Sequence, residues 1–142
     1  TYVQSDMIEK SLYDLQGLNK IIISLPSIDT GICALETKKF NEAVSKLDNT
    51  VCLAISKDLP FALKRFCAAE GIENLKAVSD FRYSDFANEY NVEMVNSPLK
   101  TLLARAVFVL DKTNKIVYTE LVEDITYEPN YEKALAAVAK LN

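Results

Sequence analysis

One cysteine stands where a thiol could become reactive. Residues 26–33 read Pro-Ser-Ile-Asp-Thr-Gly-Ile-Cys, between an apolar run over 21–25 and a helical pattern over 34–47. This order predicts a buried strand that leads through a short loop into a helix, with Cys33 in the first turn of that helix. The N-terminus of a helix presents unpaired N–H groups and a partial positive charge, which favour a thiolate over a thiol. The sequence therefore points to thiolate chemistry at Cys33.

The absence of histidine limits what can accompany this cysteine. The chain of 142 residues contains three cysteines, Cys33, Cys52 and Cys67, and no histidine. Ser-His-Asp and Cys-His activation and zinc sites with histidine ligands are therefore excluded. The wide spacing of the cysteines, without a CxxC pair, argues against a structural zinc site. A free thiol has a pKa of about 8.5, and helix-terminal or cationic surroundings can lower it to roughly 3.5–7.5.

Length and composition bound the class of protein. We interpret residues 1–142 as a single domain that can bury a core of ordinary size. A net charge of −4 argues against a partner that is a nucleic acid. No apolar run approaches the roughly 20 residues of a membrane span, so no membrane partner is expected. The low, odd number of cysteines and the lack of a signal-peptide pattern predict a cytoplasmic protein.

The hydrophobic pattern predicts the elements that must position the cysteine. The predicted strands are 20–25, 51–55, 77–78, 106–110 and 116–119, and the predicted helices are 31–47, 58–71, 84–90 and 129–141, with a short helical turn within 11–17. Asp58 is expected to be the N-cap of its helix. Strands and helices alternate in the first half, which predicts a parallel core, and the polar link 111–115 predicts an antiparallel C-terminal hairpin. This α/β arrangement of a mixed central sheet covered by helices is thioredoxin-like.

The loop sequence also resembles a known family. Pro26-x-x-x-Thr30-x-x-Cys33 is similar to the active-site signature of the peroxiredoxin superfamily, and the full string over 26–33 resembles the thiol peroxidase branch. Further similarity lies in the segments 39–43, 59–67, 103–106 and 128–135. The resemblance covers the chain from residue 20 to its end. Thiol peroxidases usually carry an N-terminal hairpin upstream, and we expect that this hairpin is missing here.

The resemblance implies an atypical two-cysteine peroxiredoxin that reduces hydrogen peroxide and alkyl hydroperoxides without a cofactor or metal. Cys33 would attack the peroxide as a thiolate and become a sulfenic acid. Cys67 would resolve this acid as an intrachain disulfide. Arg105 would direct its guanidinium at the sulfur and the peroxide oxygens, Thr30 would supply a hydroxyl, and Pro26 would shield the sulfur from water. Thioredoxin would reduce the disulfide, and the protein would be a homodimer.

Two structural expectations accompany these roles. The Cα atoms of a disulfide are usually 4.4–6.8 Å apart, whereas the two cysteines are predicted on different helices. We therefore expect one or both helix turns to unwind, with Gly31 and Gly71 as plausible places for the motion. Aromatic residues over 81–90 could contribute to a dimer face, and Arg82 could assist the dimer or the site.

The residues alone leave alternatives open. Cys33 and Cys67 could be inert buried cysteines, Thr30 a plain helix cap, and Arg105 a surface arginine in an ion pair. Cys52, inside an apolar strand, is predicted to be inert packing. Two rival functions are a general thiol–disulfide oxidoreductase, against which the lack of CxxC counts, and a thioredoxin-like binding module whose disulfide is structural or a redox switch.

Overall fold

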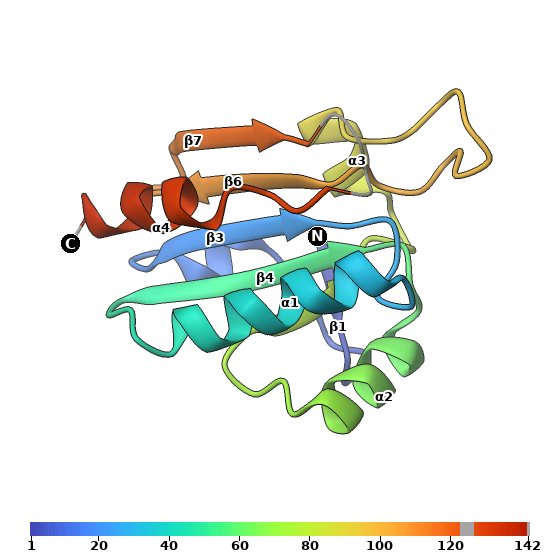
Figure 1. The fold of residues 1–142 in the computed structure, drawn as a ribbon, viewed down its shortest axis with the longest axis horizontal. Coiled ribbons are helices and arrows are strands. Elements are labelled where there is room, and N and C mark those ends of the chain that lie inside the picture. Colours follow the sequence, from blue (N-terminus) through green and yellow to red (C-terminus); the bar gives the residue numbers. More distant parts are fainter. Residues whose placement is uncertain (123–126, 142) are drawn as a thin grey trace.

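A mixed β-sheet forms the centre of the protein (Figure 1). The computed structural model describes residues 1–122 and 127–141. Within these residues the sheet has seven strands in the order β2-β1-β5-β4-β3-β6-β7. The strands are β1 (Tyr2–Gln4), β2 (Glu9–Lys10), β3 (Asn19–Ser24), β4 (Thr50–Ser56), β5 (Lys76–Ser79), β6 (Ala106–Leu110) and β7 (Ile116–Leu121). The β3–β4 and β4–β5 pairs are parallel, and β6 pairs antiparallel with β3 and β7, which confirms the predicted mixed sheet.

Helices cover both faces of this sheet. They are the 3-10 turn η1 (Leu12–Leu15) and the helices α1 (Gly31–Val44), α2 (Pro60–Glu70), α3 (Asp85–Tyr90) and α4 (Tyr131–Ala139). Helices α1, α2 and α4 pack on one face, whereas α3 and η1 pack on the other (Figure 1). Successive side chains of a strand point to opposite faces, so Ile21 and Ile23 join the first core cluster and Ile22 joins the second. No helix among the described residues is long and apolar enough to cross a membrane.

The topology brings distant segments to one edge of the sheet. The parallel strands β3 and β4 both end at this edge, and the antiparallel strand β6 begins there, with Ser24 opposite both Ile55 and Ala106. The loop that leads from β3 into α1 therefore lies beside the loop after β4 and beside the start of β6. Ser24 also links the end of β3 to the segment before β6, because its hydroxyl donates to the carbonyl oxygen of Ala104 at 2.8 Å. This edge holds the residues that the sequence singles out.

The ends of several elements differ from the sequence prediction. Helix α1 ends at Val44 rather than at residue 47, and α4 begins after Asn130, whose side chain accepts from the N–H of Lys133 at 3.0 Å. The predicted N-cap role of Asp58 is wrong, because the N-cap of α2 is Leu59. Helix α2 does end as predicted, at Gly71 in the left-handed conformation with a φ of 66°.

The N-terminal segment contains structure that the sequence did not predict. Strands β1 and β2 form a hairpin, and β1 adds antiparallel to β5. Each strand has only two or three residues, too few for a hydrophobic period to be read. The predicted helical turn is present as η1, where the N–H of Ser11 donates to Asp14 at 2.8 Å.

The aromatic stretch suggested for a dimer face is divided between core and surface. Phe86 is buried and stacks on Tyr90 with 4.3 Å between ring centroids, and both contact Phe108 in the second core cluster. Tyr83 is exposed. Arg82 forms an ion pair with Glu9 of β2 at 3.1 Å. Much of this aromatic surface therefore stabilises the fold itself.

Candidate active site

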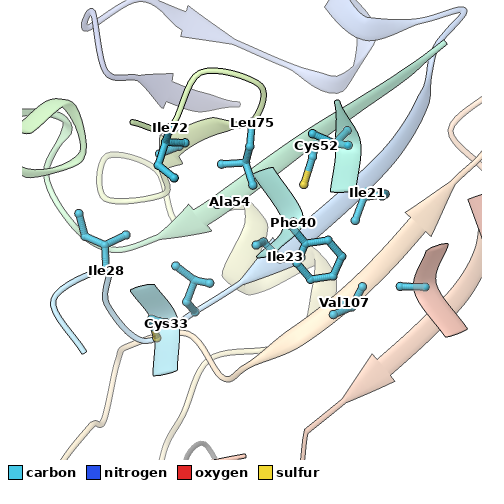
Figure 2. Close-up of a cluster of buried hydrophobic side chains, with 14 of the residues drawn as sticks. Ile21, Ile23, Ile28, Cys33, Phe40, Cys52, Ala54, Ile72, Leu75 and Val107 are labelled. Carbon is cyan, nitrogen blue, oxygen red and sulfur yellow. The ribbon is translucent and has the colours of Figure 1, made fainter. Parts of the chain in front are cut away.

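Cys33 lies in the first turn of α1, as predicted. The N-cap is Thr30, and the N–H of Ala34 makes the first bond of the helical ladder, to the Thr30 carbonyl oxygen at 3.0 Å. The N–H groups of the three residues before Ala34 precede this ladder and give the helix end its positive character. The side chain of Cys33 is fully buried (Figure 2), near Ile28 at one end of the cluster. Cys33 therefore lies on the inward face of α1.

Arg105 reaches the same place from the start of β6. Its side chain is 1% exposed, so the alternative of an ordinary surface arginine is wrong. The guanidinium hydrogen-bonds with Cys33, and Nη1 donates to Oε2 of Glu36 at 2.5 Å. Burial by itself lowers the pKa of Arg105, but attraction to Cys33 and Glu36 outweighs it and the pKa is raised. The structure therefore places Arg105, a buried cation, in contact with Cys33, although the two residues are far apart in the sequence.

Glu36 is a site residue that the sequence analysis missed. It lies three residues after Cys33 and therefore on the same face of α1. The carboxyl group is fully buried; Oε2 accepts from Arg105, whereas Oε1 has no hydrogen-bond partner among the described residues. Burial raises the pKa of Glu36 to about 7, against the opposing attraction of Arg105. The signal in the sequence that could have identified Glu36 is its place on the inward face of an amphipathic helix.

Asp58 fixes the loop that precedes α1. Its carboxylate accepts three hydrogen bonds, from Ser56 Oγ at 2.7 Å, Ser27 Oγ at 2.8 Å and the N–H of Ile28 at 2.9 Å. The side chain therefore turns toward the neighbouring loop and away from its own helix, which explains why it is not an N-cap. Pro26 directly follows β3 and is buried, and its role in shielding the sulfur stays a prediction. Asp58 thus connects the carboxyl ends of β3 and β4.

Thr30 occupies the N-cap position through its backbone only. The hydroxyl accepts no helix N–H, and instead donates to the carbonyl oxygen of Ser27 at 3.1 Å. Thr30 is therefore the helix cap that the alternative described, but without a capping bond from its side chain. Thr30 itself is exposed, three residues before the buried cysteine. Its hydroxyl oxygen keeps the capacity to accept a hydrogen bond from a bound molecule.

Cys67 is separate from Cys33 in this structure. All three cysteines are free thiols. Cys67 is partly buried near the end of α2, where it packs against the core cluster that contains Cys33 and borders a cavity of about 330 Å³. Burial raises the pKa of the Cys67 thiol, and a hydrogen bond with the backbone of Ala77 opposes this. The carbonyl oxygen of Cys67 accepts from the N–H groups of Gly71 and Ile72, so the helix end is fully formed.

Cys52 has the environment of an inert thiol. It lies in the middle of β4, opposite Ile21, and is completely buried (Figure 2). Burial, together with the nearby charge of Glu36, raises the pKa of the thiol strongly. A protonated, inaccessible thiol is neither a good nucleophile nor a good site of oxidation.

Comparisons with known proteins assign the chain to a family. The sequence profile of the Redoxin family matches residues 1–135. The chain is 52% identical to the thiol peroxidase of Corynebacterium glutamicum over 96% of this chain and 82% of the relative, and 47% identical to that of Leptospira interrogans over 95% and 80%. The crystal structure of a peroxiredoxin-like protein from Aquifex aeolicus matches with a TM-score of 0.93 and 41% identity, over 99% of this chain and 82% of that one.

These similarities bear on the predictions from sequence. The thioredoxin-like fold is confirmed by the solved relative, whose backbone superposes on nearly the whole chain. The resemblance to the thiol peroxidase branch is confirmed by curated relatives that are 52% and 47% identical. The chain belongs to the Redoxin family, in the thiol peroxidase branch of the peroxiredoxins.

Proposed function

We propose that the chain is a thiol-dependent peroxidase in which Cys33 is the nucleophile that reacts with hydrogen peroxide and alkyl hydroperoxides. The observation that carries this proposal is the contact between the buried side chains of Cys33 and Arg105 at the N-terminal turn of α1. A guanidinium keeps its charge at any working pH and offers several donors in a fixed plane. It can therefore stabilise the thiolate and, in the same geometry, polarise the oxygens of a peroxide.

The first step transfers one oxygen atom. The Cys33 thiolate attacks one peroxide oxygen, the S–O bond forms and the O–O bond breaks with its electron pair on the leaving oxygen. Cys33 is oxidised to the sulfenic acid, while the leaving oxygen takes up a proton and departs as water or an alcohol. Arg105 and the Thr30 hydroxyl hold the peroxide, and Pro26 keeps bulk water from the sulfur. Exposed Thr30 above buried Cys33 is consistent with a peroxide that enters past the hydroxyl.

The second step joins the two cysteines. Cys67 attacks the Cys33 sulfenic acid, a disulfide forms and water leaves. Because the thiols lie on two formed helices, the first turn of α1 and the end of α2 unwind for the sulfurs to meet. Gly71, which is already in the left-handed conformation, lies at the end of α2 where the helix unwinds. Unwinding at this point breaks the hydrogen bonds that the Cys67 carbonyl oxygen accepts.

The partners follow from this chemistry and from the family. A disulfide must be reduced before the next cycle, and we propose thioredoxin as the dithiol reductant. We further propose a homodimer, a single domain over 1–142 and a cytoplasmic location, in keeping with a net charge of −4 and few cysteines. The curated relatives are named thiol peroxidases, which supports the activity.

Peroxide titration of the reduced protein tests the roles of the cysteines. We expect Cys33→Ser to abolish peroxide consumption, and Cys67→Ser to allow one oxidation and then block the cycle that thioredoxin supports. Cys52→Ser is the matched control, since it alters an equally buried thiol in the same cluster. Full consumption by Cys33→Ser would refute the proposal. A Cys33–Cys67 disulfide that forms but resists thioredoxin would instead favour a redox switch or a structural disulfide.

A further inference from the structure

Two acidic groups compete for one buried cation. Arg105, 1% exposed, contacts both Cys33 and Glu36, and both of these side chains are fully buried. One positive charge can compensate one negative charge, and a second buried anion would remain without a counter-ion. If Cys33 is a thiolate, an ionised Glu36 is therefore costly, and if Cys33 becomes neutral, Arg105 needs Glu36 as its anion.

We propose that Glu36 and Cys33 share a single proton around Arg105, and that Glu36 releases this proton when peroxide consumes the Cys33 thiolate. Glu36 acts as a positioning and charge-balancing residue, since it contacts Arg105. The inference rests on the proposed peroxidase function and adds to it the source of the proton that the leaving oxygen requires.

The charge balance of the oxidation step follows directly. Before the reaction the buried trio is a thiolate, a guanidinium and a neutral carboxyl group. After the reaction it is a neutral sulfenic acid, a guanidinium and a carboxylate. The carboxyl group has lost one proton and the leaving oxygen has gained one, so the protein and its products take up none from solvent. The sum of charges in the protein interior is the same before and after.

The unpartnered oxygen of Glu36 supports this assignment. Oε2 holds Arg105, whereas Oε1 accepts no hydrogen bond from the described residues. A buried oxygen that carries part of a negative charge and has no donor is unfavourable, and protonation removes that charge at a smaller cost. Oε1 is therefore the atom on which the shared proton resides in the reduced protein.

The groups that face Glu36 from other elements favour the neutral carboxyl. The charges of Glu120 from β7 and of Glu128 from the segment before α4 raise the pKa of Glu36, while Arg105 lowers it. Tyr131 of α4 and Cys52 of β4 are also within electrostatic reach of Glu36.

Both glutamates that raise the pKa of Glu36 have side-chain partners of their own. Lys39 of α1 pairs with Glu128 at 3.0 Å, and Glu120 accepts from the hydroxyl of Tyr118 at 3.0 Å. Arg105 is thus the cation that directly contacts Glu36 in the described structure.

Proton counting during a single oxidation tests the inference. In a Cys67→Ser background, which stops at the sulfenic acid, one equivalent of hydrogen peroxide is mixed with reduced protein and a pH indicator. Thiolate absorbance in the ultraviolet is recorded before mixing, and the mass gain of one oxygen afterwards. We expect thiolate absorbance at about pH 6 together with close to zero protons taken up per sulfenic acid, rising to about one at about pH 9, where Glu36 has already ionised.

Glu36→Gln removes the ionisable carboxyl group and keeps the shape of the side chain. In this variant we expect thiolate absorbance and an uptake of about one proton at both pH values, because no group supplies the proton. Glu42→Gln, which removes an exposed carboxylate from the same helix, is the matched control and should behave like the unsubstituted background.

Three results would overturn the inference while leaving the proposed peroxidase intact. They are an uptake of about one proton at about pH 6 with Glu36 present, absence of the thiolate at that pH, and equal proton counts at that pH for the background and for Glu36→Gln. None of these results requires a loss of peroxide consumption. If the glutamine variant does not fold, the absorbance and proton count of the background at about pH 6 decide the question. Failure of the proposed function would differ, because Cys33 would gain no oxygen at any pH.

Discussion

The buried carboxyl group of Glu36 predicts a defined dependence of stability on pH. Its pKa in the folded protein is about 7, compared with 4.5 for the ordinary carboxyl group. A raised folded-state pKa means that folding binds a proton, so this contribution is fully present below about pH 4.5 and is lost as the pH rises to about 7. At about 1.4 kcal/mol per pH unit, the loss amounts to about 3 kcal/mol.

Glu36→Gln removes this titration and keeps the size of the side chain. We expect the free energy of unfolding of the variant, relative to the unsubstituted protein, to rise by about 3 kcal/mol between about pH 4.5 and 7 and to level off above that. Any constant effect of the substitution on Arg105 shifts the whole difference without changing its slope. The difference is therefore more informative than either stability alone.

Denaturant titration of the reduced proteins at a series of pH values measures this quantity. Glu42→Gln, at an exposed carboxylate on the same helix, is the control and should give a nearly constant difference. A difference for Glu36→Gln that stays constant within about 0.5 kcal/mol would show that the pKa of Glu36 is the same in the folded and unfolded states, and that burial does not raise it as inferred.

Three further substitutions test other parts of the structure. Asp58→Ala removes the three hydrogen bonds that fix the loop before α1. We expect denaturant titration to show that the free energy of unfolding falls by about 2–4 kcal/mol, and peroxidase assays to show a slower reaction. Asp29→Ala, at an exposed position in the same loop, is the control, and equal free energies of unfolding for the two variants would contradict the anchoring role of Asp58. Phe40→Ala should destabilise the first core cluster by about 3–5 kcal/mol in the same titration, and a loss below about 1 kcal/mol would mean that the core closes around the cavity. Cys52→Ala should leave the rate of peroxide consumption unchanged, because that thiol is protonated and enclosed, and a slowed rate would assign Cys52 a part in the reaction.

The sequence was sufficient for the elements with a clear apolar pattern. The runs over β3, β4 and β6 are continuous because these strands are buried on both faces, and each lies close to its predicted bounds. The loop with Cys33 was predicted from a strand that ends and a helix that begins. By contrast, β1 and β2 are too short to show a period, and their pairing with β5 depends on contacts that are remote in sequence.

The site was predictable only where a residue type suggested its own role. Cys33 and Arg105 were identified, but their contact depends on the antiparallel placement of β6 beside β3, which no local pattern encodes. Asp58 was assigned to its own helix because the local rule for N-caps cannot include hydrogen bonds to Ser27 and Ile28 on another loop. Glu36 was missed because a charged residue on a helix is usually taken as solvent-facing.

In the proposed function, the sheet order makes the reactivity of Cys33 a property of the completed fold. Cys33 leaves the ribosome about seventy residues before Arg105, and the two meet only after β6 has paired with β3. Until then the thiol lacks its guanidinium and reacts no faster with peroxide than any free cysteine does. A nascent or misfolded chain is therefore spared rapid oxidation at this position, and the speed of the reaction with peroxide can serve as an assay for correctly folded protein.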